Sequence, residues 1–251
     1  VEKPARSKHC GLCKKCGFLF MDPRTFVIGD IHGAHKALVQ CFERSGFDHD
    51  RDRLIALGDV CDGYPDVKVC IEELLKIKRC DYIIGNHDLW ALQWATEGFS
   101  EKIWLDQGGR NTIASYGSNG MPRAHVDFLR SAHAWVEVGD KLFVHGGFDP
   151  DKPLEKQGLE MLTWDRSLIE DAHRKEMRSE KHRYTAFKEI FLGHITTEMF
   201  GSDKPLKFCN IWALDTGAGW SGRLTLMDID TKNYWQSDPV GLLYPHVHAR
   251  G

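Results

Sequence analysis

Five short motifs in the sequence contain side chains that commonly bind divalent metal ions. In chain order they are GDIHG with Asp30 and His32, GDVCD with Asp59 and Asp62, GNHD with Asn86, His87 and Asp88, HGG with His145, and GHI with His194. Carboxylate, imidazole and amide donors together suit Mn²⁺, Fe²⁺ or Zn²⁺ better than Mg²⁺ or Ca²⁺. A glycine beside each donor would let the backbone turn sharply. One ion needs fewer donors than this, so we expect two ions, with an aspartate bridging them.

Each of these residues has an ordinary explanation when it is taken alone. A single histidine or aspartate at the end of a strand is more often a cap or a surface residue than a metal ligand. Five motifs in equivalent places are not explained in this way, and we interpret them as one dinuclear metal site. The predicted cofactors are two divalent ions, Mn²⁺ first, with iron or zinc as alternatives.

Each motif follows an apolar run that is too short for a helix and is therefore predicted to be a strand. The runs are TFVIGD, RLIALGD, YIIGN, KLFVHGG and IFLGH. Between the early runs, residues 35–46 and 66–80 have a helical pattern, and in the second Val67, Cys70, Ile71, Leu74, Leu75 and Lys78 share one face. This alternation predicts an α/β fold with a largely parallel sheet at its centre. Ligands bind beyond the carboxyl ends of such strands, where all five motifs fall.

Three later segments carry further expectations. Residues 106–122 are rich in glycine, asparagine and serine and predict a loop near the site. Residues 167–190 are densely charged and predict a helical insertion covering the active face, although a solvated helix is the default explanation of the charges. Residues 214–235 alternate as strands do and predict a hairpin with its turn at 231–233, extending a second sheet.

Composition limits the class of protein. The 251 residues fit one large domain, and 42% hydrophobic residues supply a sizeable core. The net charge of -3, from 33 basic and 36 acidic residues, predicts no general attraction to nucleic acid or to anionic membranes. No apolar run of membrane-spanning length occurs. Five cysteines scattered singly through apolar segments indicate reduced, mostly buried thiols and a cytoplasmic protein.

The first twenty residues differ from the rest. Residues 1–20 are basic and contain His9, Cys10, Cys13 and Cys16, whose two CxxC spacings could hold a zinc ion. The alternative is a flexible leader, native or added, before a native start at Met21. The predicted domains are therefore a leader over 1–20 and one domain over 21–251. Zinc-dependent nucleic-acid binding through the leader is a weaker hypothesis, because the chain lacks a basic surface.

The five motifs together resemble those of the calcineurin-like metallophosphoesterases. More narrowly, they resemble the bacterial and phage branch of the PPP-type serine/threonine phosphatases and the related symmetrical diadenosine tetraphosphate hydrolases. The resemblance runs from about Thr25 to Asp230. It implies two mixed β-sheets packed face to face and flanked by helices.

The resemblance also implies a role for each motif residue. Asp30 and His32 would hold the first metal and Asp59 would bridge. Asn86, which would also contact substrate, His145 and His194 would complete the second metal site. His87 would be the general acid, oriented by Asp62, and a metal-bridging hydroxide would attack phosphorus in line.

One position departs from the family pattern GDxxDRG, whose arginine binds the substrate phosphate. Here Gly63 and Tyr64 follow Asp62. The missing contact is worth ~1.5–3 kcal/mol, so another arginine must substitute or the substrate must carry less charge. The first candidate is Arg166 in LTWDRSL, which resembles a bacterial LW-x-R motif, followed by Arg110 in QGGRN and then Arg223. For each of them, the alternative is an ordinary surface arginine without a role in the site.

The resemblance implies a phosphoesterase acting on phosphomonoesters, phosphoproteins among them. The alternative within the same chemistry is hydrolysis of phosphodiesters or dinucleoside polyphosphates, with specificity relaxed by the missing arginine. From a different class, a pseudophosphatase would bind phosphorylated partners without turnover, but every expected ligand and the His87–Asp62 pair are present. The expected partner is a phosphorylated protein or small molecule, with no membrane or nucleic-acid partner.

Overall fold

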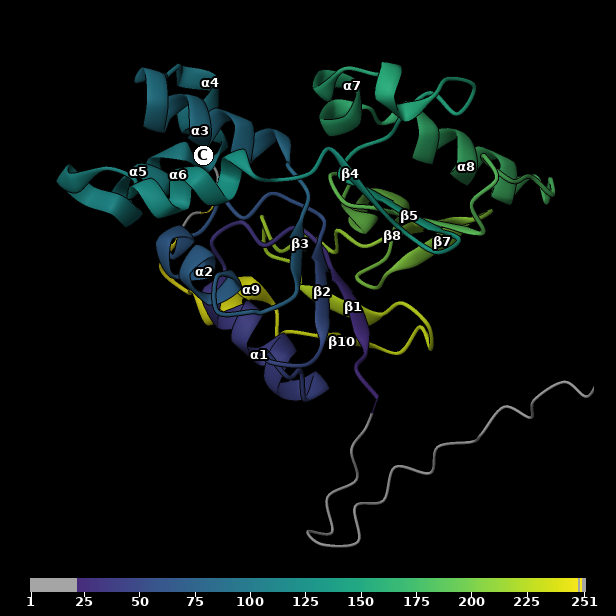
Figure 1. The fold of residues 1–251 in the computed structure, drawn as a ribbon, viewed down its shortest axis with the longest axis horizontal. Coiled ribbons are helices and arrows are strands. Elements are labelled where there is room, and N and C mark those ends of the chain that lie inside the picture. The colour runs from purple at the N-terminus through teal and green to yellow at the C-terminus, as the bar shows by residue number, and fades with distance from the viewer. Residues whose placement is uncertain (1–21, 248, 250–251) are drawn as a thin grey trace, which may run out of the picture.

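The computed structural model describes residues 22–247 and 249. The predicted leader, with its possible zinc ligands His9, Cys10, Cys13 and Cys16, lies outside the described residues. Two five-stranded mixed sheets form the centre of the molecule (Figure 1). In spatial order the first contains β10 (Tyr234–Gln236), β9 (Thr225–Asp228), β1 (Thr25–Ile28), β2 (Arg53–Ala56) and β3 (Cys80–Tyr82). The second contains β4 (Trp135–Val138), β5 (Lys141–Val144), β6 (Glu189–Leu192), β8 (Ile211–Ala213) and β7 (Leu206–Phe208).

Each sheet contains three adjacent parallel strands, which lie at one side of the first sheet and at the centre of the second. Strands β1, β2 and β3 are parallel, as are β5, β6 and β8, and the remaining pairs are antiparallel. The five predicted strands are β1, β2, β3, β5 and β6. The two-sheet fold implied by the family resemblance is confirmed. The single central sheet expected from strand alternation alone is wrong, because two parallel groups, each made of three strands, belong to different sheets.

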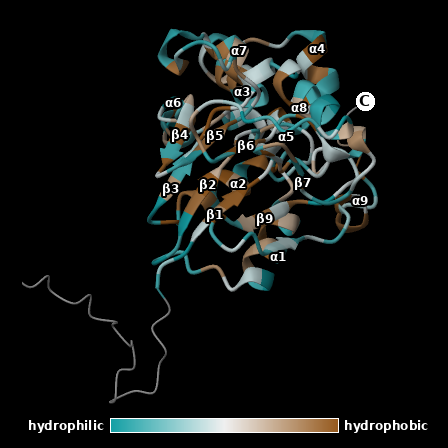
Figure 2. Cartoon of the chain, turned by 90° about the vertical axis from the view of Figure 1, so that its right-hand side faces the viewer, coloured by the Kyte–Doolittle hydropathy of each residue, from teal (hydrophilic) through white to brown (hydrophobic). Residues whose placement is uncertain are grey.

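The two sheets pack face to face through one apolar layer. Val27 and Ile55 of the first sheet belong to the same buried cluster as Phe143 and Phe191 of the second. The rings of Phe143 and Phe191 stack with centroids 4.8 Å apart. Phe26, which points the other way along β1, lies in a separate cluster under the outer helices. Figure 2 shows β1 and β2 as hydrophobic strands inside the molecule.

Helices cover the outer faces of the sheets. On the first sheet lie α1 (His35–Ser45), α2 (Val67–Leu74) and the short α9 (Val240–Leu243) (Figure 1). The chain after β3 forms α3 (Asn86–Glu97), α4 (Lys102–Trp104), α5 (Arg110–Tyr116) and α6 (Arg123–Arg130). Beside the second sheet lie α7 (Leu159–Trp164) and α8 (Ser167–Met177). None of the helices in this described part of the chain has the length and apolar character that a bilayer crossing requires.

Two expected helical or loop segments differ from the structure. The helix expected over 66–80 ends at Leu74, because the chain must then reach Cys80, which pairs with Leu54 of β2. Leu75, which was expected on the apolar face of that helix, is 49% exposed. The loop expected over 106–122 is mostly helical. Its glycines lie at a kink, where Gly108 has φ 104°, and at helix ends, while α5 runs between them.

Two other segments lie elsewhere than expected. Residues 167–190 form α8 and the start of β6, and Leu168, Ile169 and Ala172 pack into the core outside the second sheet. This apolar face places α8 on that sheet and away from the cavity described below, so the segment is not an insertion over the active face. The C-terminal hairpin is present, but β9 pairs with β1, so it extends the first sheet.

The cysteines agree with a reduced protein. Cys41, Cys61 and Cys70 are buried free thiols, and Cys80 and Cys209 are half-buried free thiols. Burial raises the pKa of Cys41 to about 12, which leaves this thiol protonated at neutral pH. Among the described residues, the cysteines therefore serve as small apolar side chains.

An ion pair ties the start of β1 to the start of β2. Arg24 donates to the buried carboxylate of Asp52 from its backbone N–H at 2.9 Å and from Nη2 at 2.7 Å, and the Asp48 N–H adds a bond of 3.0 Å. Burial acts to raise the pKa of Asp52, but these hydrogen bonds outweigh it and lower the pKa. We expect Asp52→Asn to reduce the free energy of unfolding by about 1–2 kcal/mol at pH 7.

This stabilisation depends on pH in one direction. Because the pKa of Asp52 is lower in the folded than in the unfolded chain, the stabilisation is present above the unfolded value of about 4 and is lost as the pH falls through the folded value. Urea unfolding of the wild type and Asp52→Asn should therefore give a smaller difference at pH 3 than at pH 7. An equal difference at both would contradict this origin.

Candidate active site

The motif residues from both sheets converge at one edge of the sandwich. The loops that carry them follow the carboxyl ends of β1, β2, β5 and β6, and the GNHD motif follows β3 and begins α3. Hydrogen bonds join the two halves there. Nδ1 of His145, after β5, lies 2.7 Å from the Leu57 carbonyl after β2. The His194 N–H, after β6, donates to Asp30 after β1 at 3.1 Å.

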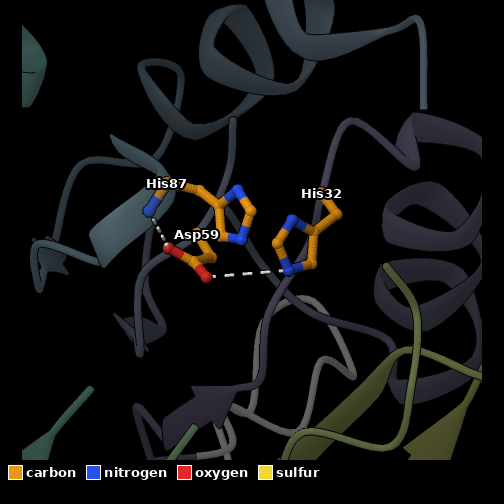
Figure 3. A group of neighbouring side chains, drawn as sticks. All are labelled: His32, Asp59 and His87. Atoms are coloured by element: carbon orange, nitrogen blue, oxygen red, sulfur yellow. Dashed lines mark hydrogen bonds and ion pairs between the residues drawn. The ribbon is translucent and has the colours of Figure 1, made fainter. Parts of the chain in front are cut away.

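One group of possible metal ligands consists of His32, Asp59 and His87, which are buried. One donor atom from each lies within 4.8 Å of the others. Nε2 of His32 is 3.6 Å from Oδ2 of Asp59 and 3.9 Å from Oδ2 of Asp30. The backbone N–H of His87 donates to Oδ1 of Asp59 at 3.0 Å (Figure 3). Asp59 is therefore fixed by one oxygen and directs the other toward His32.

A second group shares Asp59 and adds His145 and His194. One donor atom from each of these three residues again lies within 4.8 Å of the others. Nε2 of His145 lies 3.4 Å from Oδ2 of Asp59 and 3.1 Å from Oδ1 of Asn86. The same carboxylate oxygen of Asp59 thus faces His32 on one side and His145 on the other, the position required of a residue bridging two ions.

The hydrogen bonds of the histidine rings fit metal binding. Nδ1 of His32 lies 3.0 Å from the Cys61 carbonyl, as Nδ1 of His145 does from Leu57 at 2.7 Å. A carbonyl oxygen only accepts, so each Nδ1 carries a proton, and Nε2 is the ring nitrogen that faces Asp59. This is the arrangement that a metal-ligating imidazole needs.

The electrostatics of the site also fit a cation. Burial raises the pKa of Asp30 well above its usual range, and Asp215 and Asp59 add to the rise. Burial opposes charge on His145, yet Asp59 and Asp30 raise its pKa to about 10. These carboxylates therefore attract positive charge strongly. Burial and His145 lower the pKa of His194 to about 3, so His194 is a neutral ring that is able to ligate.

Backbone strain gathers at the same residues. Eight described residues other than glycine have a positive φ, and four of them are His32 at 48°, Asp59 at 50°, Asp62 at 66° and His194 at 62°. Each costs ~1–2 kcal/mol for a residue with a side chain. Strain of this kind concentrates at functional sites, where neighbouring structure holds it in place.

His87 and Asp62 form a buried pair. Nδ1 of His87 lies 2.7 Å from Oδ2 of Asp62. Two residues that the sequence did not suggest complete the shell of Asp62: Trp104 donates from Nε1 at 2.8 Å, and Thr112 donates from Oγ1 at 2.6 Å. Burial raises the pKa of Asp62, although His87, Thr112 and Trp104 oppose the rise. No spacing pattern in the sequence links Trp104 or Thr112 to Asp62.

Asp88 holds two of the loops together. Its carboxylate accepts backbone hydrogen bonds of 2.8–3.1 Å from residues in both loops and one of 2.7 Å from the Tyr82 hydroxyl. The backbone donors are Asp59, Val60, Cys61 and Gly85. Burial and the charge of Asp59 raise the pKa of Asp88 to about 6. Its role was detectable in the sequence, because an acid at the third position of a helix is a capping signal.

A cavity of about 580 Å³ is lined by the motif residues His32, Asp59, Asn86, His87 and His194. Of the three predicted arginines, Arg166 lines it, and its Nε lies 3.4 Å from Nε2 of His194. Arg110 is 61% exposed and pairs with Asp106, and Arg223 bonds the Ser237 carbonyl; neither lines the cavity. Asn86, which was also predicted to contact substrate, lies in the cavity wall.

The sequence interpretation missed Asp215. This buried carboxylate lines the cavity and adds to the raised pKa of Asp30. A signal was available, because the run IWALDTG ends β8 with an aspartate and a glycine, as the recognised motifs do.

The structure explains the missing arginine. Gly63 has φ 78°, and a Cβ there would lie 2.9 Å from both the carbonyl oxygen and Cβ of His32. Gly108 packs closely against Gly63, because a Cβ added to Gly108 would lie 2.2 Å from the Gly63 backbone nitrogen. Asn111 Nδ2 also donates to the Gly63 carbonyl. The position of the family's arginine therefore has no room for a side chain.

We expect Gly63→Ala to be destabilising beyond the cost of its backbone conformation. Gly46, at the end of α1, is the matched control, because its φ is 61° and a Cβ there would meet nothing within 4 Å. Gly63→Ala should lose about 1–3 kcal/mol more than Gly46→Ala, because only the first adds a collision. Denaturant unfolding measures both, and equal losses would contradict the collision.

Comparisons with known proteins agree with this geometry. Residues 23–217 match the family model of the calcineurin-like phosphoesterases. The chain is 25% identical over 211 residues to serine/threonine-protein phosphatase 1 of Salmonella typhimurium, covering 81% of this chain and 91% of that protein. It is 23% identical over 270 residues to the symmetrical bis(5'-nucleosyl)-tetraphosphatase of Pseudomonas fluorescens, covering 82% and 92%. A crystal structure assigned to a diadenosine tetraphosphatase superimposes with a TM-score of 0.64 at 16% identity, covering 87% of this chain and 95% of that one.

Proposed function

Because the chain belongs to the calcineurin-like phosphoesterases, which makes it a metal-dependent hydrolase of phosphoric esters, we propose that its substrates are phosphomonoesters. The reaction is hydrolysis of the P–O ester bond with His87 as general acid. The observation that carries the proposal is the buried pair of His87 and Asp62, with Nδ1 and Oδ2 2.7 Å apart and His87 in the wall of the cavity.

The pair gives His87 a defined proton to transfer. Asp62 accepts from Nδ1, which fixes the orientation and the tautomer of the ring, as carboxylate–histidine pairs do. Trp104 and Thr112 hold Asp62 in turn, so the ring is positioned through three contacts on one carboxylate. The other ring nitrogen of His87 is then the atom that delivers a proton to the leaving oxygen.

The metal ligands are proposed to be Asp30, His32 and Asp59 for one ion and Asp59, Asn86, His145 and His194 for the other. The mixed nitrogen and oxygen donors favour Mn²⁺, with iron or zinc as alternatives. When bound, two such ions lower the pKa of water and neutralise phosphoryl charge. The bridging role of Asp59 is supported by its place in both groups of donors.

Arg166 is proposed as the residue that binds the phosphate in place of the absent arginine. It lines the cavity beside His194, and a guanidinium binds phosphate through directed hydrogen bonds. The alternative substrate is a phosphodiester or dinucleoside polyphosphate. One observation favours it: Gly63 removes a cationic contact that a dianion would use.

The rates of Mn²⁺-dependent hydrolysis of p-nitrophenyl phosphate, a monoester, and bis-p-nitrophenyl phosphate, a diester, distinguish a phosphomonoesterase from a phosphodiesterase. A monoester rate that exceeds the diester rate by at least tenfold would support the proposal. A diester that matches or exceeds the monoester would replace it with a phosphodiesterase. Absence of turnover with Mn²⁺, Fe²⁺ and Zn²⁺ would favour a protein that only binds phosphorylated partners.

A further inference from the structure

Three tryptophans belong to the lining of the cavity. Trp90 on α3, Trp164 at the end of α7 and Trp220 in the loop after β8 all line it. Trp164 is 39% exposed and Trp220 is 47% exposed. Large exposed aromatic side chains beside a catalytic site indicate that apolar surface is covered when a ligand binds.

Two of the tryptophans pack against histidines of the site, the proposed general acid His87 and the proposed metal ligand His194. The ring of Trp90 meets that of His87 edge to face with centroids 5.2 Å apart, and Trp90 meets Trp164 at 5.1 Å. Trp164 in turn meets His194 at 5.8 Å. Because His87 is proposed to protonate the leaving oxygen, the group attached to that oxygen leaves alongside Trp90.

Trp220 is held in place by the residue that follows the missing arginine. The buried hydroxyl of Tyr64 donates to the Trp220 carbonyl, and the Tyr64 ring packs on Tyr244 at 4.8 Å. The sequence GY at positions 63 and 64 thus lacks the family's guanidinium and anchors the backbone of a tryptophan that lines the cavity. The two changes act together: less charge is available for the substrate and more aromatic surface is available.

The charges of the cavity argue against a polyphosphate. Among the described residues lining it, Arg166 is the single arginine or lysine, whereas Glu198 and Asp215, which are not among the proposed metal ligands, are acidic. The two proposed ions would neutralise the phosphoryl group that reacts, and a chain of further phosphates would need additional cationic side chains. In a nucleotide, moreover, the ester oxygen is attached to a ribose, whose hydroxyls need polar partners. In an aryl phosphate, the flat ring itself comes next, and it suits tryptophan.

We propose that Trp90, Trp164 and Trp220 form an aromatic subsite that binds the ring of an aryl phosphate, such as a phosphotyrosine side chain. The inference rests on the proposed phosphomonoesterase function and specifies its substrate class. In the reaction, an oxygen from water forms a bond to phosphorus and the bond from phosphorus to the phenolic oxygen breaks. The phenolic oxygen takes its proton from His87, and the products are phosphate and a phenol.

Binding of non-hydrolysable phosphonates tests the subsite without turnover. Isothermal titration with phenylphosphonate and ethylphosphonate, both with Mn²⁺ present, should show about tenfold tighter binding of the phenyl compound. Trp220→Ala should remove most of this preference and Trp220→Phe should retain it. Tyr234→Ala, an exposed aromatic residue on β10 that does not line the cavity, is the control and should retain it as well. Equal binding of the two compounds by the wild type would overturn the inference.

Steady-state kinetics then show whether the ring bound by the aromatic subsite is the phenol of a phosphotyrosine or the base of a nucleotide. Phosphotyrosine and phosphoserine peptides with identical flanking residues are compared with diadenosine tetraphosphate. Trp220→Ala should lower kcat/KM for the phosphotyrosine peptide about tenfold and for the phosphoserine peptide less than twofold. A larger loss with diadenosine tetraphosphate than with phosphotyrosine would overturn the aryl assignment in favour of a nucleobase. If no monoester is hydrolysed, the proposed function fails, while the phosphonate preference still decides whether the subsite exists.

Discussion

His87→Asn is expected to lower kcat for a phosphoserine peptide by about 10²–10⁴-fold while leaving the metal content unchanged. The alkoxide that leaves from serine is a strong base, so its departure depends on the proton from His87. The loss should be smaller with p-nitrophenyl phosphate, because p-nitrophenolate leaves readily without a proton. This dependence on the leaving group distinguishes an acid from a residue that only maintains the fold.

The structure contains an alternative for His87, because a donor atom of its ring lies within 4.8 Å of donor atoms of His32 and Asp59. If His87 were a ligand, His87→Asn would lower the bound Mn²⁺ per chain, and activity with both substrates would fall equally. Metal analysis of the purified variant decides between these roles. His182→Asn, an exposed histidine away from the cavity, is the matched control and should behave as the wild type.

Asp59→Asn is expected to have an effect of similar or larger size by a different cause. Oδ2 of Asp59 faces Nε2 of His32 at 3.6 Å and Nε2 of His145 at 3.4 Å, so removing its charge weakens both metal positions together. We expect the affinity for Mn²⁺ to fall by more than about 100-fold, since losses of 10–100-fold are typical of residues that only support a ligand. Activity at low metal should fall with it.

Equilibrium dialysis with Mn²⁺, followed by metal analysis, measures this loss. Asp230→Asn, an exposed aspartate that pairs with Lys141, serves as the control for removing one negative charge. If Asp59→Asn retained both ions at the wild-type affinity, the bridging role would be wrong.

The sequence predicted the parts of the site that lie at strand ends. Each of Asp30, Asp59, His145 and His194 follows an apolar run and stands beside a glycine, so local pattern and local geometry agree. The structure brings the donor atoms of Asp59, His145 and His194 together from two different sheets. The alternation of strands and helices could not distinguish one large sheet from two smaller sheets, because a pair of parallel strands has the same local pattern in either arrangement.

The parts that the sequence did not reveal depend on contacts between distant segments. Trp104 and Thr112 lie on either side of the kink at Gly108 in the sequence and both donate to Asp62, and no periodicity encodes that meeting. The absence of an arginine at Gly63 was visible in the sequence, but its cause, the backbone of His32, was not. The position of α8 was also missed, because it depends on the packing of three apolar residues within a segment that is otherwise charged.

The most direct test of the account is to count bound ions and measure turnover in the same sample. The protein is freed of metal with a chelator and titrated with Mn²⁺, and bound Mn²⁺ per chain is measured together with hydrolysis of p-nitrophenyl phosphate. The account predicts no activity without metal and full activity when two ions are bound per chain. Full activity after chelation, or activity that saturates at one bound ion, would contradict it.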